Sequence, residues 1–96
     1  MLIQGIVFHT TRIDECKAAV DEYRAATEGR RTASRGILTK DRDEADHYLN
    51  VVFFDSYESA MQNSEMPETQ KLAMTLDSLS DGETRFLNLE VLSDMN

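Results

Sequence analysis

The segment His47–Phe54 places the strongest constraint on the fold. It reads HYLNVVFF and is the most hydrophobic and most β-prone run of the chain. Apolar and aromatic side chains occur at both odd and even positions, a pattern typical of a strand that is covered on both faces. The segment therefore predicts a central strand, with the rest of the chain packed around it.

A helical segment, residues 56–79, follows this strand and contains the only proline of the chain, Pro67. Asp55 or Ser56 is expected to cap its first turn. Proline removes a backbone donor and clashes with the preceding turn. The helix should therefore break or bend at Pro67, which also suits the first position of a second helix.

Four further segments complete the predicted order. Residues 2–8 and 85–92 alternate as strands, residues 12–28 place their apolar side chains on one helical stripe, and residues 30–41 form a weaker, charged edge strand. The order is strand, helix, strand, strand, helix, strand. With right-handed crossovers it predicts a single ferredoxin-like α+β domain over residues 1–96. The four-stranded antiparallel sheet has order 4-1-3-2, with the helices on one face.

Alternation divides the strand residues into two sets, and both are largely apolar. The purely apolar set is expected to face the helices, and it contains Leu49, Val51, Phe53, Leu87, Leu89 and Val91. The other set is expected on the open face, and it contains Gln4, Ile6, Phe8, Tyr48, Asn50, Val52, Phe54, Phe86, Asn88 and Glu90. An apolar face of this size does not normally stand in water, so a homodimer through the open sheet face is expected.

Charge and cysteine content narrow the partners and the compartment. Eighteen acidic residues against ten basic ones give a net charge of −8, which opposes binding to nucleic acid or to an anionic membrane. The single cysteine, Cys16, excludes an internal disulfide and fits a reducing cytoplasm. It lies on the apolar helical stripe and is interpreted as a buried small hydrophobe. No apolar run is long enough to cross a bilayer, and the early first strand leaves no room for a signal peptide.

Several stretches together resemble a known superfamily. These are the central strand, the run FDSYESAM at 54–61, the helix broken before Pro67, and the closing FLNLEVL at 86–92. They resemble the dimeric α/β-barrel superfamily and, within it, the antibiotic biosynthesis monooxygenase (ABM)-like proteins. The resemblance implies a dimeric α/β barrel without a cofactor. That family includes cofactor-independent oxygenases that act on polycyclic aromatic substrates.

The same resemblance bears on haem degradation. The haem-degrading branch uses an Asn, Trp and His trio. This chain has no tryptophan, and neither of its histidines lies in the segment 56–79. These departures from the trio argue against haem degradation by this chain.

Strand direction brings three polar residues to one end of the sheet. His9 ends the first strand, His47 begins the third and Arg85 begins the fourth, and alternation is expected to point all three toward the helices. The resemblance implies a pocket between sheet and helices. A histidine there could act as a general base, and Arg85 could hold a carboxylate or phenolate. The alternative is that these strand-end side chains are simply solvated.

Two further features bear on a ligand. Methionines Met61 and Met66, with Met74, could supply an adaptable apolar wall. Five of the ten basic residues lie between Arg30 and Arg42, which suits either an anionic ligand or, as the favoured interpretation, edge protection and salt bridges to the acidic helices. No third ligand at suitable spacing joins the histidines, so no metal site is expected.

Two classes of function follow from these observations. The first is an enzyme or binder acting on a small apolar or aromatic molecule, such as a cofactor-independent monooxygenase. The second is a non-catalytic dimeric module that binds a metabolite or a protein. A deep pocket near His9 and His47 would favour the first class, and a solidly packed layer would favour the second.

Overall fold

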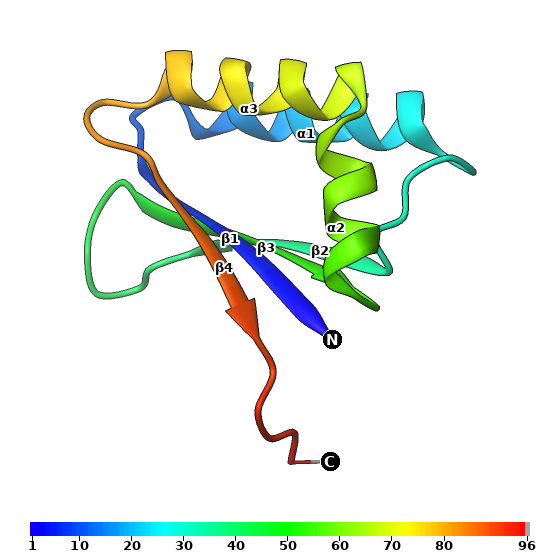
Figure 1. Ribbon diagram of the computed structural model, residues 1–96. Helices are drawn as coiled ribbons and strands as arrows, with labels where there is room; N and C mark the ends of the chain where they lie inside the picture. Colours follow the sequence, from blue (N-terminus) through cyan, green and yellow to red (C-terminus); the bar gives the residue numbers. More distant parts are fainter. Residues whose placement is uncertain (96) are drawn as a thin grey trace.

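A computed structural model describes residues 1–95 of the chain. Its elements are β1 (Leu2–His9), α1 (Ile13–Thr27), β2 (Arg35–Lys40), β3 (His47–Phe54), α2 (Tyr57–Ser64), α3 (Pro67–Leu79) and β4 (Arg85–Glu90). The strands form one antiparallel sheet in the order β2-β3-β1-β4. All three helices lie on one side of this sheet (Figure 1). The predicted ferredoxin-like fold and strand order are confirmed.

The two inner strands, β1 and β3, pair along their whole length. Leu2 lies opposite Phe54 at one end of the pair, and His9 lies opposite His47 at the other. β4 pairs with the outer edge of β1 from Leu2 to Val7, and β2 pairs with β3. The most hydrophobic segment of the sequence therefore does occupy the centre of the sheet.

The predicted interruption of the second helical segment is present. α2 ends at Ser64, and α3 begins with Pro67 in its first turn. Met66 is extended, with φ −65° and ψ 133°, because a residue before proline disfavours the helical conformation. Ser56 caps α2, since its side-chain oxygen accepts a hydrogen bond from the Ser59 amide at 3.1 Å. α2 and α3 consequently run in different directions over the sheet (Figure 1).

The expected assignment of the two sheet faces is wrong. Phe8 and Phe54 are 0% and 1% exposed, and Phe8 and Tyr48 pack with Cys16 of α1 and Leu76 of α3. The set expected on the open face thus points to the helices. The reason is physical: large aromatic side chains bury the most area when they reach across the layer to the helices. Both sets are apolar, so alternation alone cannot show which set faces the helices.

The other set, whose large side chains are aliphatic apart from Phe53, forms the opposite side of the sheet, here called the open face. Cross-strand register places its side chains next to one another: Ile3, Gly5, Val7, Ile37, Leu49, Val51, Phe53, Leu87 and Leu89. Most are half-buried, and Leu89 is 46% exposed. Within residues 1–95, no helix has the length and apolar character needed to cross a membrane.

Candidate functional site

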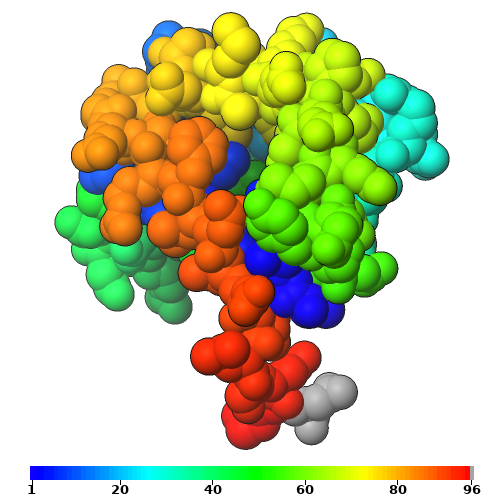
Figure 2. All heavy atoms as spheres, in the orientation of Figure 1, coloured from blue at the N-terminus to red at the C-terminus, as the bar shows by residue number. Residues whose placement is uncertain are grey.

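A cavity of about 650 Å³ lies between the sheet and the helices. This volume is within the range of small-molecule sites in proteins. The lining is largely apolar, and its members come from the sheet and from the helices: Ile6, Val20, Leu38, Asn50, Val52, Asn63, Thr69, Leu72, Ala73 and Phe86. In Figure 2 the surface is hollowed between the orange-red β4 region and the green α2, with blue atoms of β1 at the bottom.

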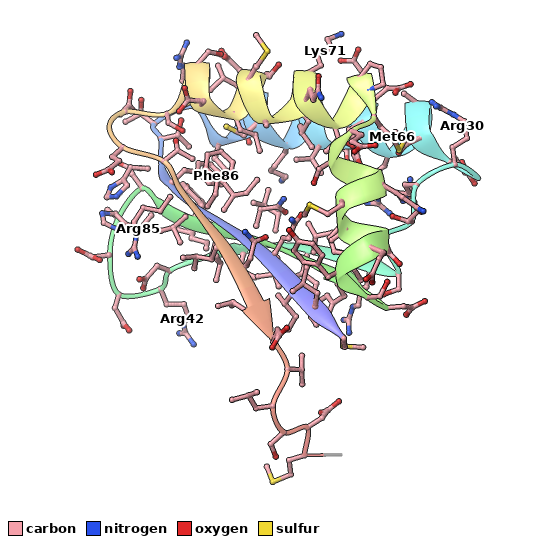
Figure 3. All side chains as sticks on the ribbon, in the orientation of Figure 1. Arg30, Arg42, Met66, Lys71, Arg85 and Phe86 are labelled. Atoms are coloured by element: carbon pink, nitrogen blue, oxygen red, sulfur yellow. The ribbon has the colours of Figure 1, made fainter. Side chains whose placement is uncertain are left out.

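Helix placement explains why this layer is hollow. α2 is only eight residues long, and the break at Pro67 turns the chain away before α3 begins. Small side chains such as Ala73 face the space where the helices pass over the sheet. Phe86 of β4 stays 59% exposed although it lies on the helix side, between β4 and the helical layer (Figure 3). The helices therefore do not seal the sheet completely.

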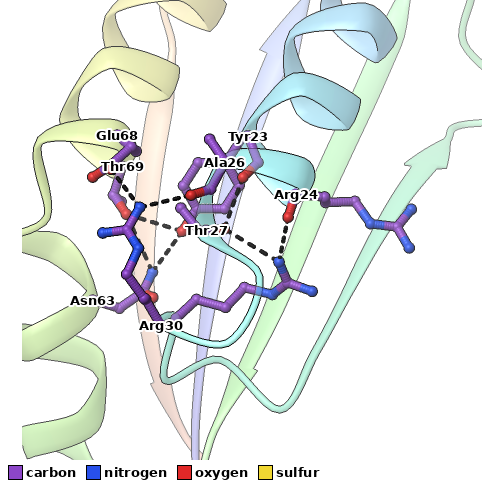
Figure 4. A network of polar contacts seen from close by, with 9 residues as sticks. Tyr23, Arg24, Ala26, Thr27, Arg30, Asn63, Glu68 and Thr69 are labelled. Atoms are coloured by element: carbon purple, nitrogen blue, oxygen red, sulfur yellow. Dashed lines mark hydrogen bonds and ion pairs between the residues drawn. The ribbon is translucent and has the colours of Figure 1, made fainter.

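A closed hydrogen-bond network fixes one wall of the cavity (Figure 4). Asn63 is 4% exposed, and its Nδ2 donates to the Tyr23 hydroxyl at 3.0 Å. The Thr32 amide donates to Asn63 Oδ1 at 3.2 Å, and the Tyr23 hydroxyl lies 2.9 Å from Thr69 Oγ1. The network joins α1, α2 and α3, so its groups hold the wall in place.

Asn50 differs from Asn63 because its amide is left without a partner. It lies in the middle of β3, is 7% exposed and lines the cavity. Its cross-strand neighbours on the sheet are Ile6 and Leu38, both apolar. Among residues 1–95, no side-chain hydrogen bond to Asn50 is formed. Among residues 1–95, the only fully enclosed side-chain polar atom without a partner is Glu68 Oε1, so the Asn50 amide is open to the cavity and offers a donor and an acceptor to whatever enters it.

The structure brings His9 and His47 together, but on the open face. Their ring centroids are 3.7 Å apart, with the ring planes tilted by 58°. His47 Nδ1 lies 3.2 Å from Glu44 Oε2. Neither histidine lines the large cavity. The expectation that they point toward the helices is wrong, because it followed from the inverted assignment of the sheet faces.

Arg85 lies at the same end of the sheet, at the start of β4 (Figure 3). It lines a smaller pocket of about 180 Å³ together with His9, Val7 and the turn that contains Asp81 and Glu83. This pocket is on the rim of the open face, away from the large cavity. Arg85 and the two histidines therefore form a separate polar corner.

The methionines are also placed differently from the expectation. Met61 packs against the buried cluster of Leu2, Phe54 and Ala60. Met66 is the residue before Pro67, and Met74 is 73% exposed. None of the three lines the cavity. Its apolar wall is formed instead by Ile6, Val52 and Leu72 and their neighbours, because α3 presents its leucine side inward and its methionine outward.

Metal binding and thiol chemistry each require particular side chains. Within residues 1–95, no group of three or more His, Cys, Asp or Glu side chains is close enough to hold a metal ion. Cys16 is fully buried, and burial raises the pKa of its thiol above the ordinary value. The thiol therefore stays protonated, as suits a core side chain rather than a nucleophile.

Solved structures with the same fold are found among antibiotic biosynthesis monooxygenases. A putative antibiotic biosynthesis monooxygenase from Deinococcus radiodurans superimposes with a TM-score of 0.80 at 13% identity, covering 100% of this chain and 97% of that chain. SnoaB, a cofactor-independent oxygenase from Streptomyces nogalater, gives a TM-score of 0.79 at 13% identity, covering 98% and 94%. Rv0793 from Mycobacterium tuberculosis gives 0.75 at 13% identity over the whole of both chains. No family model matches the sequence, and no curated protein matches it.

These likenesses confirm the resemblance to ABM-like proteins at the level of the fold. At 13% identity they establish the arrangement of strands and helices and leave the chemistry open. The sequence did contain a pointer to the cavity that its interpretation missed: Asn50 is the one amide within an otherwise hydrophobic strand. A polar residue at such a position calls for a partner or a ligand.

Proposed function

We propose that this protein binds a small aromatic molecule in the cavity between sheet and helices and oxidises it with dioxygen, without a cofactor. One observation carries the proposal: a largely apolar cavity into which the unpartnered amide of Asn50 projects. The apolar lining suits an aromatic body, and one amide suits a ring hydroxyl or carbonyl. The fold that this chain shares with SnoaB, a cofactor-independent oxygenase, adds support.

The chemistry requires an electron-rich substrate, because the protein supplies no redox group in this scheme. A ring methylene reacts with dioxygen to give a carbonyl and water. One oxygen atom enters the carbonyl, the other leaves as water, and both are reduced by electrons from the substrate carbon. The Asn50 amide would hold the substrate oxygen and favour its negatively charged form during the reaction.

The proposal also includes a homodimer through the open face. The cross-strand aliphatic residues there are only half-buried, and an apolar surface of this kind marks an interface. A second sheet placed on it would complete an α/β barrel. His9, His47 and Arg85 would then lie at the rim of the interface, where their charge and hydrogen bonds could meet the partner copy. The single buried Cys16 is compatible with the reducing cytoplasm as the compartment.

The test uses anthrone, whose methylene would become the second carbonyl of anthraquinone. Purified protein in air should form anthraquinone faster than buffer alone, with a rate that saturates as anthrone increases. Asn50→Leu should lower kcat/KM by roughly tenfold or more, the size of one lost hydrogen bond to a developing charge. His9→Ala is the matched control, since it lies outside the cavity. A rate indistinguishable from buffer, together with no measurable anthrone binding, would reject the proposal.

A second function, binding without turnover, is favoured by one specific feature. Within residues 1–95, no imidazole lines the cavity, and its titratable side chains are lysine, arginine, tyrosine and one aspartate. A general base poised near neutral pH is therefore missing from the wall. Saturable binding of anthrone with no oxygen consumption in an oxygen electrode would identify the protein as a binder.

A further inference from the structure

Basic side chains are concentrated in one part of the cavity wall. Lys17, Arg24 and Arg31 line the cavity, and Asp21 is its only acidic lining residue within residues 1–95. The whole chain has the opposite balance, with eighteen acidic residues against ten basic ones. The cavity is therefore locally positive within a negatively charged protein.

Helical spacing accounts for part of this group. Lys17, Asp21 and Arg24 lie four and three residues apart on α1, so they share one face of the helix. Arg35 also borders the cavity, but it pairs with Phe53, whose side chain lies on the open face. We therefore leave Arg35 out of the basic group.

Arg31 is held in place without being neutralised. Its Nη1 donates to the Arg24 carbonyl at 2.8 Å and to Thr27 Oγ1 at 3.2 Å. Thr27 is fully buried, and both acceptors belong to the last turn of α1. Across residues 1–95, the four ion pairs of the structure include none of Lys17, Arg24 and Arg31. The guanidinium therefore keeps donors free for another acceptor, because it carries five N–H groups in all.

The alternative explanation of these charges, salt bridges to the acidic helices, fits a different arginine. Arg30 Nη2 lies 2.6 Å from Glu68 Oε2. Arg31 follows Arg30 directly, but its side chain turns to the end of α1 and finds only neutral oxygens there. Ion pairing thus accounts for Arg30, whereas the ion pairs of residues 1–95 give Arg31 no carboxylate partner.

We propose that the natural ligand of the cavity is an organic anion: an aromatic body that carries a carboxylate or a similar acidic group. This inference rests on the proposed function, because it takes the cavity as the ligand site. The aromatic body would pack against Ile6, Val52 and Leu72, and the Asn50 amide would bind a ring oxygen. Arg31 would bind the acidic group, with Lys17 and Arg24 adding attraction at long range.

Physical chemistry favours this arrangement. A guanidinium pairs with a carboxylate through two parallel hydrogen bonds, which gives both energy and orientation. A cleft with apolar walls also concentrates the field of the charges that line it. Since the rest of the protein is acidic and repels anions, selection for an anionic ligand has to come from this local group.

The experiment uses two fluorescent probes with the same aromatic body. 8-Anilino-1-naphthalenesulfonate carries a negative group, and N-phenyl-1-naphthylamine lacks it. Arg31→Gln should weaken binding of the sulfonate probe by about tenfold, as expected for one charge-assisted hydrogen bond. The double variant Lys17→Gln/Arg24→Gln removes only long-range attraction and should weaken it by about threefold. Binding of the neutral probe should change by less than about twofold. Added salt should weaken binding of the sulfonate probe and leave binding of the neutral probe unchanged.

A matched control removes a positive charge elsewhere. Arg42 is exposed in the turn between β2 and β3 and does not line the cavity (Figure 3). Arg42→Gln should leave the affinity for both probes unchanged. If circular dichroism shows that Arg31→Gln is unfolded, the double variant provides the test of the anionic ligand. Lys17 and Arg24 are exposed side chains on α1, so their replacement should leave the fold intact.

The outcomes separate this inference from the proposed function. The charge variants could lose affinity equally for both probes, or lose it for neither. Either result would overturn the anionic ligand, and the cavity would remain a site for aromatic molecules. Ala73→Trp should fill the cavity and abolish binding of both probes. Failure of the wild type to bind either probe, or unchanged binding in Ala73→Trp, would reject the cavity itself as the ligand site.

Discussion

The imidazole rings of His9 and His47 face each other across β1 and β3, with their centroids 3.7 Å apart. The two residues are direct cross-strand partners at one end of the sheet, on the side away from the helices. Their separation from the cavity decides which side chains can contact a ligand there. It also gives a direct test of any role for these histidines.

His9→Ala and His47→Ala should leave ligand binding in the cavity unchanged within about twofold, since neither ring lines it. Both side chains are half-buried at strand ends, so each substitution should lower the free energy of unfolding by no more than about 1 kcal/mol. Fluorescence titration and urea denaturation measure the two quantities. A large loss of turnover with intact binding would indicate that the reaction takes place at the open face.

Asn50 and Asn63 should respond in opposite ways to the same substitution. Asn50→Leu removes an amide that has no partner, so we expect stability to stay equal or to rise by about 1 kcal/mol. Asn63→Leu removes partners from the Tyr23 hydroxyl and the Thr32 amide, and should destabilise by about 1–3 kcal/mol. Urea denaturation of both variants checks this. Similar losses of stability in both variants would mean that the Asn50 amide has a hydrogen-bond partner in the folded protein.

The sequence was sufficient to predict the elements and their order. Periodicity separates strands from helices, and the break at Pro67 follows from local backbone chemistry that no tertiary contact can override. The central place of the segment His47–Phe54 followed from its hydrophobicity. These features depend on residues close together in the chain.

The sheet faces and the site could not be obtained in the same way. Alternation shows that Phe8 and Phe54 lie on one face and Val51 and Phe53 on the other, but both faces are apolar. The choice depends on how well each set fits the helices, which is a tertiary property. His9, His47 and Arg85 were misplaced by that single inversion. The resemblance implied a pocket between sheet and helices, and local chemistry predicted the break at Pro67, but which side chains line the cavity depends on the same assignment of the sheet faces.

Val51→Asp should dissociate a homodimer formed through the open face. Val51 lies at the centre of that face, between Gly5 and Ile37 on the neighbouring strands. An unpaired carboxylate at such an interface costs several kcal/mol, on the order of the whole stability of a small domain. We expect light scattering at micromolar concentration to show a dimer for the wild type and a monomer or unfolded chain for the variant.

Tyr57→Asp serves as the matched control for the dimer. Tyr57 is an exposed aromatic side chain, at 55%, which begins α2 and lies outside the open face. This variant should keep the mass of the wild type. A wild-type monomer at micromolar concentration would contradict the predicted dimer, and so would dissociation by Tyr57→Asp alone.

The ion pair of Arg30 and Glu68 should make stability depend on pH in the acid range. A hydrogen bond from Arg30, at 2.6 Å, and a backbone N–H hold the pKa of Glu68 below its ordinary value of 4.5. A carboxyl with a lowered pKa in the folded state adds stability above its unfolded pKa, and this contribution is lost as the pH falls through the folded pKa. Glu68→Gln should therefore lower the urea midpoint at about pH 7, and this difference should shrink as the pH is lowered into the acid range. Glu22→Gln is the control, because the Lys71–Glu22 pair is longer, at 3.7 Å, and 75% exposed on both sides. A midpoint difference for Glu68→Gln that persists unchanged into acid would show that the loss comes from packing rather than from the charge.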